Sequence, residues 1–386
     1  MAKKPKRGES LLIYGAPDYD ANAYYATNFA AGDPLAFFKV RGKSYLWARG
    51  LEEDRAKNEA TVDVVLNSAE ITERLKKKGA SDIPTSADYI AEIARMLKEE
   101  TFLVPENFPL GLADKLRVKG IDIRVKESPF FEERVVKSGA EIKKIIAAEK
   151  AVLAAMDEVV KILSASRIDG KKRLVYKDKV LTSEFLRNAA ENYLFSRGYL
   201  PWNTIIACGA HGAEPHNKGR GTVYAHKPIV CDIFPRSRNT YYWGDFTRTF
   251  CVGNPTPKVV RMYEAVKKAN ETAIKMVKPG VNAKAIHEKV SEMLKSYGFE
   301  TRQRKDGRWE GFFHGTGHGI GLEIHELPPV SARDHILKVG EVFTIEPGLY
   351  YPEEGGVRIE DVVIVAKGGC KVISKYPKTL VIKPKR

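Results

Sequence analysis

The segment His314-Gly-Thr-Gly-His318-Gly-Ile-Gly-Leu-Glu-Ile-His325-Glu326 is the most informative part of this sequence, because it places three histidines among glycines. Glycine lets a backbone bend tightly and approach a ligand closely. Four acidic residues occur in apolar, strand-like runs, where a carboxylate is costly to bury unless a cation or strong hydrogen bonds compensate it. These acids are Asp232 after Pro-Ile-Val-Cys, Asp245 before Phe-Thr-Arg-Thr-Phe, Glu346 after Val-Phe-Thr-Ile, and Glu360 within Val-Arg-Ile-Glu-Asp-Val-Val-Ile-Val. Such a group of acids indicates a shared positive partner.

The combination of two Asp, two Glu and one His suits a pair of divalent ions such as Mn, Co, Zn or Fe, with carboxylates bridging them. Two ions about 3.5–4 Å apart convert a bridging water into hydroxide at neutral pH and hold a tetrahedral intermediate. Each acid alone is a weak signal, because a single Asp at a strand end is more often a cap or a salt-bridge partner. Their conjunction in one part of the chain predicts metal-assisted hydrolysis.

Four segments resemble, in order, the signature blocks of the proline-specific pita-bread metallopeptidases of peptidase family M24. This group contains Xaa-Pro aminopeptidase and Xaa-Pro dipeptidase (prolidase), and the resemblance covers about 245 residues strongly. The first 125 residues look like the family's creatinase-like N-terminal domain more loosely, through Asn22-Ala-Tyr-Tyr-Ala-Thr-Asn-Phe29. The four blocks are Gly244–Phe250, His314–Glu326, Thr344–Tyr350 and Val357–Asp361.

The resemblance implies an α/β (α+β) chain of two domains. Residues 1–130 would form the creatinase-like N-terminal α/β domain. Residues 131–386 would form the pita-bread catalytic domain, with a curved, largely antiparallel sheet covered by helices. A length of 386 residues agrees with two domains, because it exceeds what one hydrophobic core usually fills.

Carried over residue by residue, the resemblance also implies a site that holds two divalent ions, with manganese expected first. Asp245 would bridge the two ions. Glu346 would also act as the proton shuttle, taking a proton from the metal-bound water and passing it to the leaving proline nitrogen. The implied metal ligands are Asp232, Asp245, His318, Glu346 and Glu360.

Further residues receive roles from the same resemblance. His325 would donate to the developing gem-diolate oxygen, and His216, in Glu-Pro-His-Asn-Lys, would contact the substrate. His314 would line the proline subsite. Arg358 stands two residues before Glu360, hence on the same face of an expected strand, and would bind substrate or orient ligands.

The implied activity is hydrolysis of Xaa-Pro bonds at the N-terminus of peptides or in dipeptides, with a proline-containing peptide as substrate and a homodimer as the assembly. Dipeptides and longer peptides both remain open. Two alternatives come from other classes: a metal-free hydrolase of the creatinase type, and a non-catalytic binding protein of this fold, possibly associated with nucleic acid. Retention of all five implied ligands argues against both, because without metal four carboxylates would repel one another.

One departure from the family pattern concerns the first two ligands. Asp232 and Asp245 are thirteen residues apart, where eleven is usual, and Phe234-Pro235 replaces an expected glycine. If the two acids end antiparallel strands of one hairpin, a turn two residues longer keeps them facing the same way, since side chains alternate with period two. The insertion therefore leaves the ligand set intact and puts only the rim of the cleft, and so the substrate preference, in question.

Composition constrains the partners. The chain carries 64 Lys and Arg against 49 Asp and Glu, and residues 141–386 hold 41 and 27 of them. The lysines are dispersed and no nucleic-acid motif accompanies them, which indicates a solvated basic surface and disfavours nucleic-acid binding. The four cysteines are far apart without a CxxC pair, which favours the reducing cytoplasm. We expect no membrane span and no signal peptide, and a tail at Met1–Ser10.

Hydrophobic periodicity predicts the elements that carry these residues. A hairpin is expected at 34–40 and 43–48. Helices are expected at 87–101, 141–163, 182–196, 258–278 and 282–297, the last capped by Asn282. Strands are expected at 116–125, 203–208, 228–234, 245–252, 319–325, 342–345 and 358–365.

Overall fold

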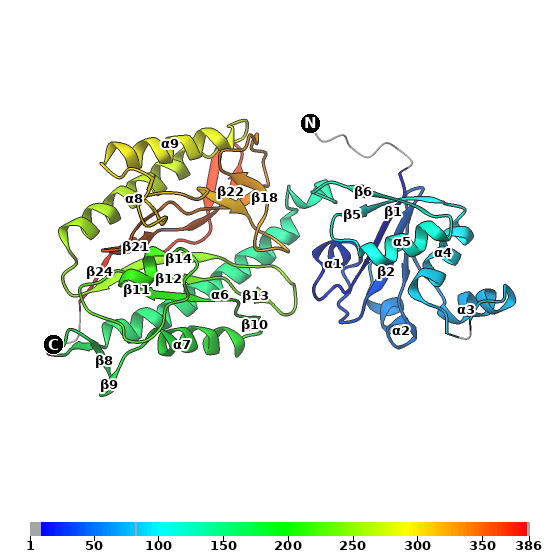
Figure 1. Ribbon diagram of the computed structural model, residues 1–386, viewed down its shortest axis with the longest axis horizontal. Coiled ribbons are helices and arrows are strands. Elements are labelled where there is room, and N and C mark those ends of the chain that lie inside the picture. Colours follow the sequence, from blue (N-terminus) through cyan, green and yellow to red (C-terminus); the bar gives the residue numbers. More distant parts are fainter. Residues whose placement is uncertain (1–8, 82, 384–386) are drawn as a thin grey trace. The chain divides into compact units, whose positions relative to one another are not determined.

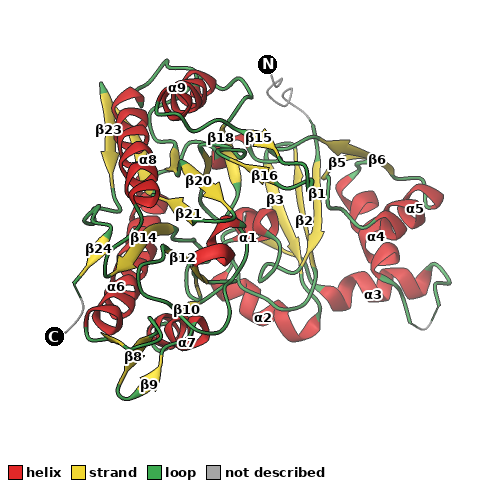
Figure 2. Cartoon of the chain, turned by 60° about the vertical axis from the view of Figure 1, so that its left-hand side comes forward, coloured by secondary structure: helices red, strands yellow, loops and turns green. Residues whose placement is uncertain are grey.

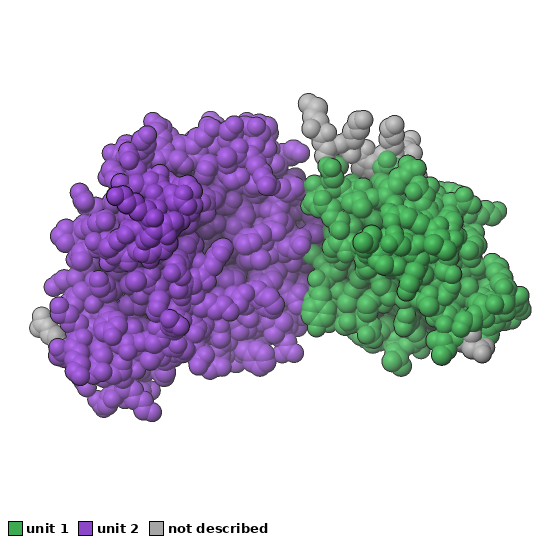
Figure 3. Space-filling model, in the orientation of Figure 1, with its two compact units in different colours: residues 1–132 green, residues 133–386 purple. Residues whose placement is uncertain are grey.

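The computed structural model describes residues 9–81 and 83–383, so most of the expected N-terminal tail lies outside the described residues. The chain forms two compact units, Met1–Glu132 and Glu133–Arg386 (Figure 3). Each unit mixes helices with sheets, and Figure 1 gives their order along the chain.

Unit 1 contains a six-stranded sheet in the order β4-β3-β2-β1-β5-β6. Strands β2 and β3 form the expected antiparallel hairpin, while β5 and β6 pair in parallel. Helices α3, α4 and α5 lie on one side of the sheet (Figure 2), where their apolar side chains join its core. Helix α1 contributes to the core on the other face. The elements are β1 (Leu11–Gly15), α1 (Ala21–Thr27), β2 (Leu35–Val40), β3 (Lys43–Trp47), α2 (Gly50–Glu59), β4 (Val64–Val65), α3 (Ser68–Lys77), α4 (Ser86–Leu97), β5 (Thr101–Pro105), α5 (Leu110–Val118) and β6 (Asp122–Lys126).

The strand expected at 116–125 is wrong in its first part. Leu116 belongs to α5, where it packs in the core with Leu112 and Ala113, at helical rather than strand spacing. Gly120, with φ +82°, follows the end of this helix, and β6 starts at Asp122.

Unit 2 places its main sheets between two pairs of helices (Figure 1). The pair α6 (Gly139–Ser164) and α7 (Ser183–Phe195) packs on a four-stranded sheet, and the pair α8 (Pro257–Met276) and α9 (Ala283–Ser296) packs on a five-stranded one. All four helices confirm the predicted periodicity. Asn282 caps α9 as expected, because its side chain accepts a hydrogen bond from the Lys284 amide.

The two main sheets of unit 2 are largely antiparallel. The four-stranded sheet has the order β11-β12-β14-β24, with β11 (Ile205–Cys208), β12 (Ile229–Ile233), β14 (Phe246–Val252) and β24 (Val381–Ile382). The five-stranded sheet has the order β18-β17-β19-β22-β23, with β17 (Gly317–Gly319), β18 (Glu326–Val330), β19 (Val342–Ile345), β22 (Asp361–Ala366) and β23 (Gly369–Val372).

Smaller elements complete unit 2. The hairpin of β20 (Gly348–Tyr351) and β21 (Gly355–Arg358) lies against β14 and the 3-10 turn η2 (Gly209–Ala213). The remaining elements are η1 (Glu132–Arg134), β7 (Arg167–Ile168), β8 (Leu174–Tyr176), β9 (Lys179–Val180), β10 (Tyr199–Leu200), β13 (Arg236–Ser237), β15 (Arg302–Gln303) and β16 (Trp309–Glu310).

Two expected strands differ from the structure near the predicted site. Residues 320–325 form a loop between β17 and β18 instead of a strand. The expected strand 358–365 is divided at Ile359 and Glu360, because the Glu360 amide donates to the Thr247 carbonyl (3.1 Å) and the Glu360 carbonyl accepts from Arg248 Nη1 (2.6 Å). The chain therefore leaves its partner β20 after Arg358 and joins β19 at Asp361, so Arg358 and Glu360 do not share a strand.

Candidate active site

Every residue that the sequence predicts for the site lines one cavity of about 910 Å³ in unit 2. The carboxylates of Asp232, Asp245 and Glu360 are nearly inaccessible to solvent, whereas His216 and His325 are exposed at its wall. The cavity thus has a buried acidic floor and a wall of histidines.

The register of two strands brings the aspartates together. Asp232 lies in β12 opposite Thr247 of β14, and Asp245 stands two residues before Thr247. Opposed residues of an antiparallel pair point to the same face, as do residues two apart, so the three side chains share a face. The two extra residues fall in the connection between β12 and β14. In this connection Arg236 forms a β-bridge with Trp243, and β13 pairs with β10. The alternation of side chains along paired strands therefore explains why Asp232 and Asp245 point to the same face despite the longer connection.

Three of the predicted ligands converge most closely. One ligand atom each from Asp245, His318 and Glu360 lies within 4.8 Å of the other two. His318 Nε2 is 3.6 Å from Asp245 Oδ2 and 3.5 Å from Glu346 Oε1. His318 Nδ1 lies 3.1 Å from the Gly319 carbonyl, so it donates there and leaves the Nε2 lone pair directed at the acids.

Asp232 and Glu360 are oriented by neighbouring side chains. Arg358 Nη2 donates to Asp232 Oδ2 (2.6 Å), and Thr247 Oγ1 donates to Glu360 Oε2 (2.8 Å). Asp232 Oδ1 is buried and has no hydrogen-bond partner among the described residues. A buried carboxylate oxygen in this state is costly unless a cation binds it, so the donor set fits a divalent metal ion.

The pKa values follow from burial and crowding. Burial, followed by the charges of neighbouring carboxylates, raises the pKa of Asp245 and of Glu360 well above the ordinary range. Burial also raises the pKa of Glu346 to about 7. For His318, burial and the nearby His325 lower the pKa to about 3, so its ring is neutral at pH 7. Because the imidazole is neutral, it does not offset the clustered carboxylates, and a bound cation would stabilise the site.

Tyr350 connects the histidine wall to Arg358. Arg358 Nη1 donates to the Tyr350 hydroxyl (2.9 Å), which lies 2.9 Å from His314 Nε2. His314 Nδ1 is 2.7 Å from the Gly315 carbonyl, which assigns the proton to Nδ1 and makes Nε2 the acceptor from Tyr350. Sequence reasoning gave Tyr350 no role, although it closes the quoted block Thr344–Tyr350. The ring of His325 packs edge-on against that of His318, with centroids 4.3 Å apart.

Glu149 of α6 is a second residue that sequence reasoning missed. It is fully buried, and its Oε1 accepts the backbone amide of Asp245 at 2.7 Å. Its position on the apolar stripe of α6, between Ile145 and Val152, is a signal that the sequence contains. Burial raises the pKa of Glu149 to about 8.

Glu149→Gln is expected to change how stability depends on pH in protein stripped of metal. An acid whose pKa rises from 4.5 to about 8 on folding binds its proton more tightly in the folded state. The folded state therefore loses stability as pH rises through this window, by about 1.4 kcal/mol per pH unit. Glutamine does not ionise, so at pH 7 the variant should exceed the wild type in free energy of unfolding by about 3 kcal/mol. Denaturant unfolding at pH 5 and pH 7 measures the difference.

Glu264→Gln on the exposed face of α8 is the matched control, and its stability should follow the wild type at both pH values. Parallel profiles for wild type and Glu149→Gln would contradict the buried, protonated state of Glu149.

The other histidines lie outside the cavity lining. His226 Nδ1 accepts the Asn254 amide (2.8 Å), and His335 Nε2 lies 2.9 Å from Glu341 Oε1. His287 is half-buried, 3.0 Å from Thr316 Oγ1 and beside the Phe312 ring. His287 stands among lysines and glutamates in the sequence, so its local pattern gives no sign of this contact on the packed side of α9.

A family model for metallopeptidase family M24 matches residues 142–367. This chain belongs to metallopeptidase family M24. An Xaa-Pro dipeptidase of Pyrococcus horikoshii is 32% identical over 387 residues, covering 97% of this chain and 94% of the relative. Membership makes the M24 chain a hydrolase and implies bound divalent metal without identifying the element.

Solved structures support the same assignment of the M24 chain. The prolidase from Pyrococcus furiosus superimposes with a TM-score of 0.76 and 26% identity, covering 96% of this chain and 97% of that one. An X-Pro aminopeptidase from Thermotoga maritima gives a TM-score of 0.79 with 24% identity and covers 97% of both chains, a likeness of fold. The prediction of the pita-bread fold is confirmed.

No helix in the described part of the M24 chain has both the length and the apolar character needed to cross a membrane.

Proposed function

We propose that this M24 chain is a dinuclear-metal exopeptidase that hydrolyses Xaa-Pro bonds at the N-terminus of peptides or in dipeptides. The observation that carries the proposal is the convergence of Asp245, His318 and Glu360, with ligand atoms within 4.8 Å of one another, on the floor of a cavity walled by histidines. The names of the relatives, Xaa-Pro dipeptidase and prolidase, support the proline specificity.

The proposed metal ligands are five side chains around this floor, and manganese is the ion that we propose first. Bound divalent ions would lower the pKa of a water molecule and polarise the carbonyl of the scissile bond. The orphaned Asp232 Oδ1 and the free Nε2 of His318 support this assignment. The five are Asp232, Asp245, His318, Glu346 and Glu360.

The protein's own groups would move the protons. Glu346 would accept a proton at a carboxylate oxygen and deliver it to the proline nitrogen as the bond breaks. A pKa near 7 suits this exchange, because a general base works best when its pKa lies near the operating pH. His325 would donate to the carbonyl oxygen as negative charge develops on it, and its exposed ring at the cavity wall is free to approach a substrate.

The proline side of the substrate would meet His314 and His216. The Arg358 guanidinium is almost fully buried and bound to Asp232 and Tyr350, so we propose that it orients these groups rather than binding substrate directly. The Arg358–Tyr350–His314 chain of hydrogen bonds would keep the His314 ring fixed beside the proline.

The test combines metal analysis with two substrate classes. Protein purified without chelator should contain a divalent metal by elemental analysis, and with added Mn it should cleave Xaa-Pro dipeptides. Hydrolysis of longer Xaa-Pro peptides, measured in parallel, distinguishes a prolidase from an aminopeptidase P. A protein that holds no metal and cleaves neither class would overturn the proposal.

The assembly and the compartment follow from weaker observations. We propose a homodimer, as in the family resemblance, which light scattering coupled to gel filtration tests directly. All four cysteines are free thiols, which supports a reducing, cytoplasmic compartment.

A further inference from the structure

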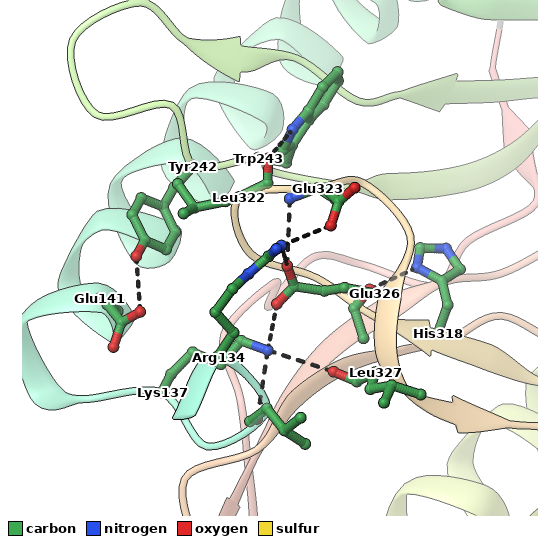
Figure 4. A network of polar contacts seen from close by, with 12 residues as sticks. Arg134, Lys137, Glu141, Tyr242, Trp243, His318, Leu322, Glu323, Glu326 and Leu327 are labelled. Carbon is green, nitrogen blue, oxygen red and sulfur yellow. Dashed lines mark hydrogen bonds and ion pairs between the residues drawn. The ribbon is translucent and has the colours of Figure 1, made fainter. Parts of the chain in front are cut away.

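A buried ionic cluster includes Glu326, the last residue of the loop 320–326 (Figure 4). This loop also carries His325. The centre of the cluster is the carboxylate of Glu326, the next residue along the chain. Arg134 Nη2 donates to Glu326 Oε2 at 2.7 Å, and Lys137 Nζ lies 2.6 Å from Glu326 Oε1. Only 9% of the Arg134 side chain and 1% of the Lys137 side chain are exposed. Both cations precede α6, about 190 residues away in sequence.

The loop 320–326 is wound around this carboxylate. The Glu323 amide donates to Glu326 Oε2 at 3.3 Å, and Arg134 Nη2 also reaches Glu323 Oε2 at 2.7 Å. A Cβ added at Gly321 would collide with the Glu326 carboxylate, so the backbone passes directly over it. Only a glycine permits this approach.

Trp243 holds the same loop from the other side, where the acidic floor of the cavity lies. Its backbone amide donates to the Gly321 carbonyl at 3.0 Å, and its indole Nε1 donates to the Leu322 carbonyl at 3.1 Å (Figure 4). Trp243 stands two residues before Asp245. The loop is thus fixed on one side by the ion pairs and on the other by the segment that carries Asp245.

We propose that Arg134 and Lys137 are positioning residues, which hold the 320–326 loop through Glu326 and so fix the ring of His325 over the cavity. The inference rests on the proposed function, in which His325 donates to the developing oxyanion. Among the described residues the His325 ring packs edge-on against His318 and makes no hydrogen bond, so the backbone of the loop is what can hold the ring in place. Arg134 lies shortly before α6 in the chain. Glu149 of the same helix accepts a hydrogen bond from the Asp245 amide, so this part of the chain contacts both sides of the site.

Stability alone is a poor explanation for the cluster. Two buried cations facing one buried carboxylate are costly to desolvate, and an apolar cluster of similar volume generally gives at least equal stability. Compared with an apolar cluster, ion pairs with short, directed hydrogen bonds fix the geometry of the group that they hold more precisely.

Arg134→Gln tests the proposal with two independent readouts. Hydrogen exchange followed by mass spectrometry should show about tenfold faster exchange in the peptide 319–327, whether or not metal is present. In Xaa-Pro hydrolysis, kcat should fall by about 10–100-fold with KM changed less than about twofold, because His325 acts on the transition state. Arg134→Lys keeps the charge and should recover much of both losses. If Arg134→Gln does not fold, Lys137→Gln removes the other cation that binds Glu326 and should show the same two losses.

Arg167→Gln is the matched control, since its ion pair with Asp178 is exposed on the same unit, and both readouts should stay at the wild-type level. Unchanged loop exchange, or faster exchange with unchanged kcat, would overturn the positioning role. A wild type that cleaves no Xaa-Pro peptide would instead overturn the proposed function, while the exchange measurement would still decide whether the cations hold the loop.

Discussion

Glu346→Gln should reduce kcat for Xaa-Pro hydrolysis by about 10²–10⁴-fold, the range that loss of a positioned general base produces. The amide fills the same volume but cannot accept and return a proton. Asp232, Asp245 and Glu360 are proposed as metal ligands alone, so none of them is expected to take over the proton transfer assigned to Glu346. Steady-state kinetics with a Xaa-Pro dipeptide measures the loss.

Metal content separates the two roles assigned to Glu346. If elemental analysis shows that the variant keeps its metal, the loss reflects proton transfer; a loss of metal would show that coordination dominates. The control Glu292→Gln changes an exposed carboxylate on α9, paired only with Lys289 among the described contacts, and should keep full activity. Wild-type kcat in Glu346→Gln would remove Glu346 from the mechanism.

Manganese should stabilise the wild type strongly, and Asp245→Asn should abolish most of this effect. At a metal concentration about 100 times the dissociation constant, binding to the folded state adds about 2.7 kcal/mol, which corresponds to a Tm increase of roughly 5–10 °C. Asp245 is central to the effect because its carboxylate is buried among Glu360, Asp232 and Glu346, whose mutual repulsion a cation relieves. Thermal unfolding with and without Mn measures the shift.

The same site should release protons when it binds metal. Burial and neighbouring carboxylates raise the pKa of Asp245 and of Glu360, which favours their protonated forms in the metal-free protein, so metal ions compete with protons and the apparent metal affinity should increase as pH rises. His318, with a pKa near 3, is already neutral and contributes no proton at pH 7. Calorimetry in two buffers of different ionisation enthalpy measures the release.

The control for the Mn stabilisation is Asp178→Asn, which changes an exposed carboxylate and should be stabilised by Mn as the wild type is. A full stabilisation of Asp245→Asn by Mn would contradict the proposed site.

Most of the helices in unit 2 could be predicted because local signals agree with the packing. The apolar stripe of α6 and the Asn282 cap of α9 both reside within a few residues of sequence. The predicted site residues share one cavity for a related reason: charged side chains in apolar strands are conspicuous, and strand pairing brings Asp232 and Asp245 to one face.

The failures have long-range causes. Ile320, Leu322 and Ile324 alternate as in a strand, yet the surrounding backbone is held by Trp243 and wound around Glu326, so it has no room to pair. The break before β22 depends on Arg248 and Thr247, more than 100 residues away. No local pattern contains such partners.

Helix α6 connects two features of the site through one rigid element. The cations that hold the His325 loop precede its first turn, and Glu149, which binds the Asp245 amide, lies one residue beyond its third turn. Deleting a single residue between them would rotate Glu149 by about 100° and shorten the span by about 1.5 Å. The turn between Asp232 and Asp245, in contrast, accommodates two additional residues without changing the facing of the acids. Changes in chain length are therefore tolerated at the rim of this site and excluded from the helix beneath it.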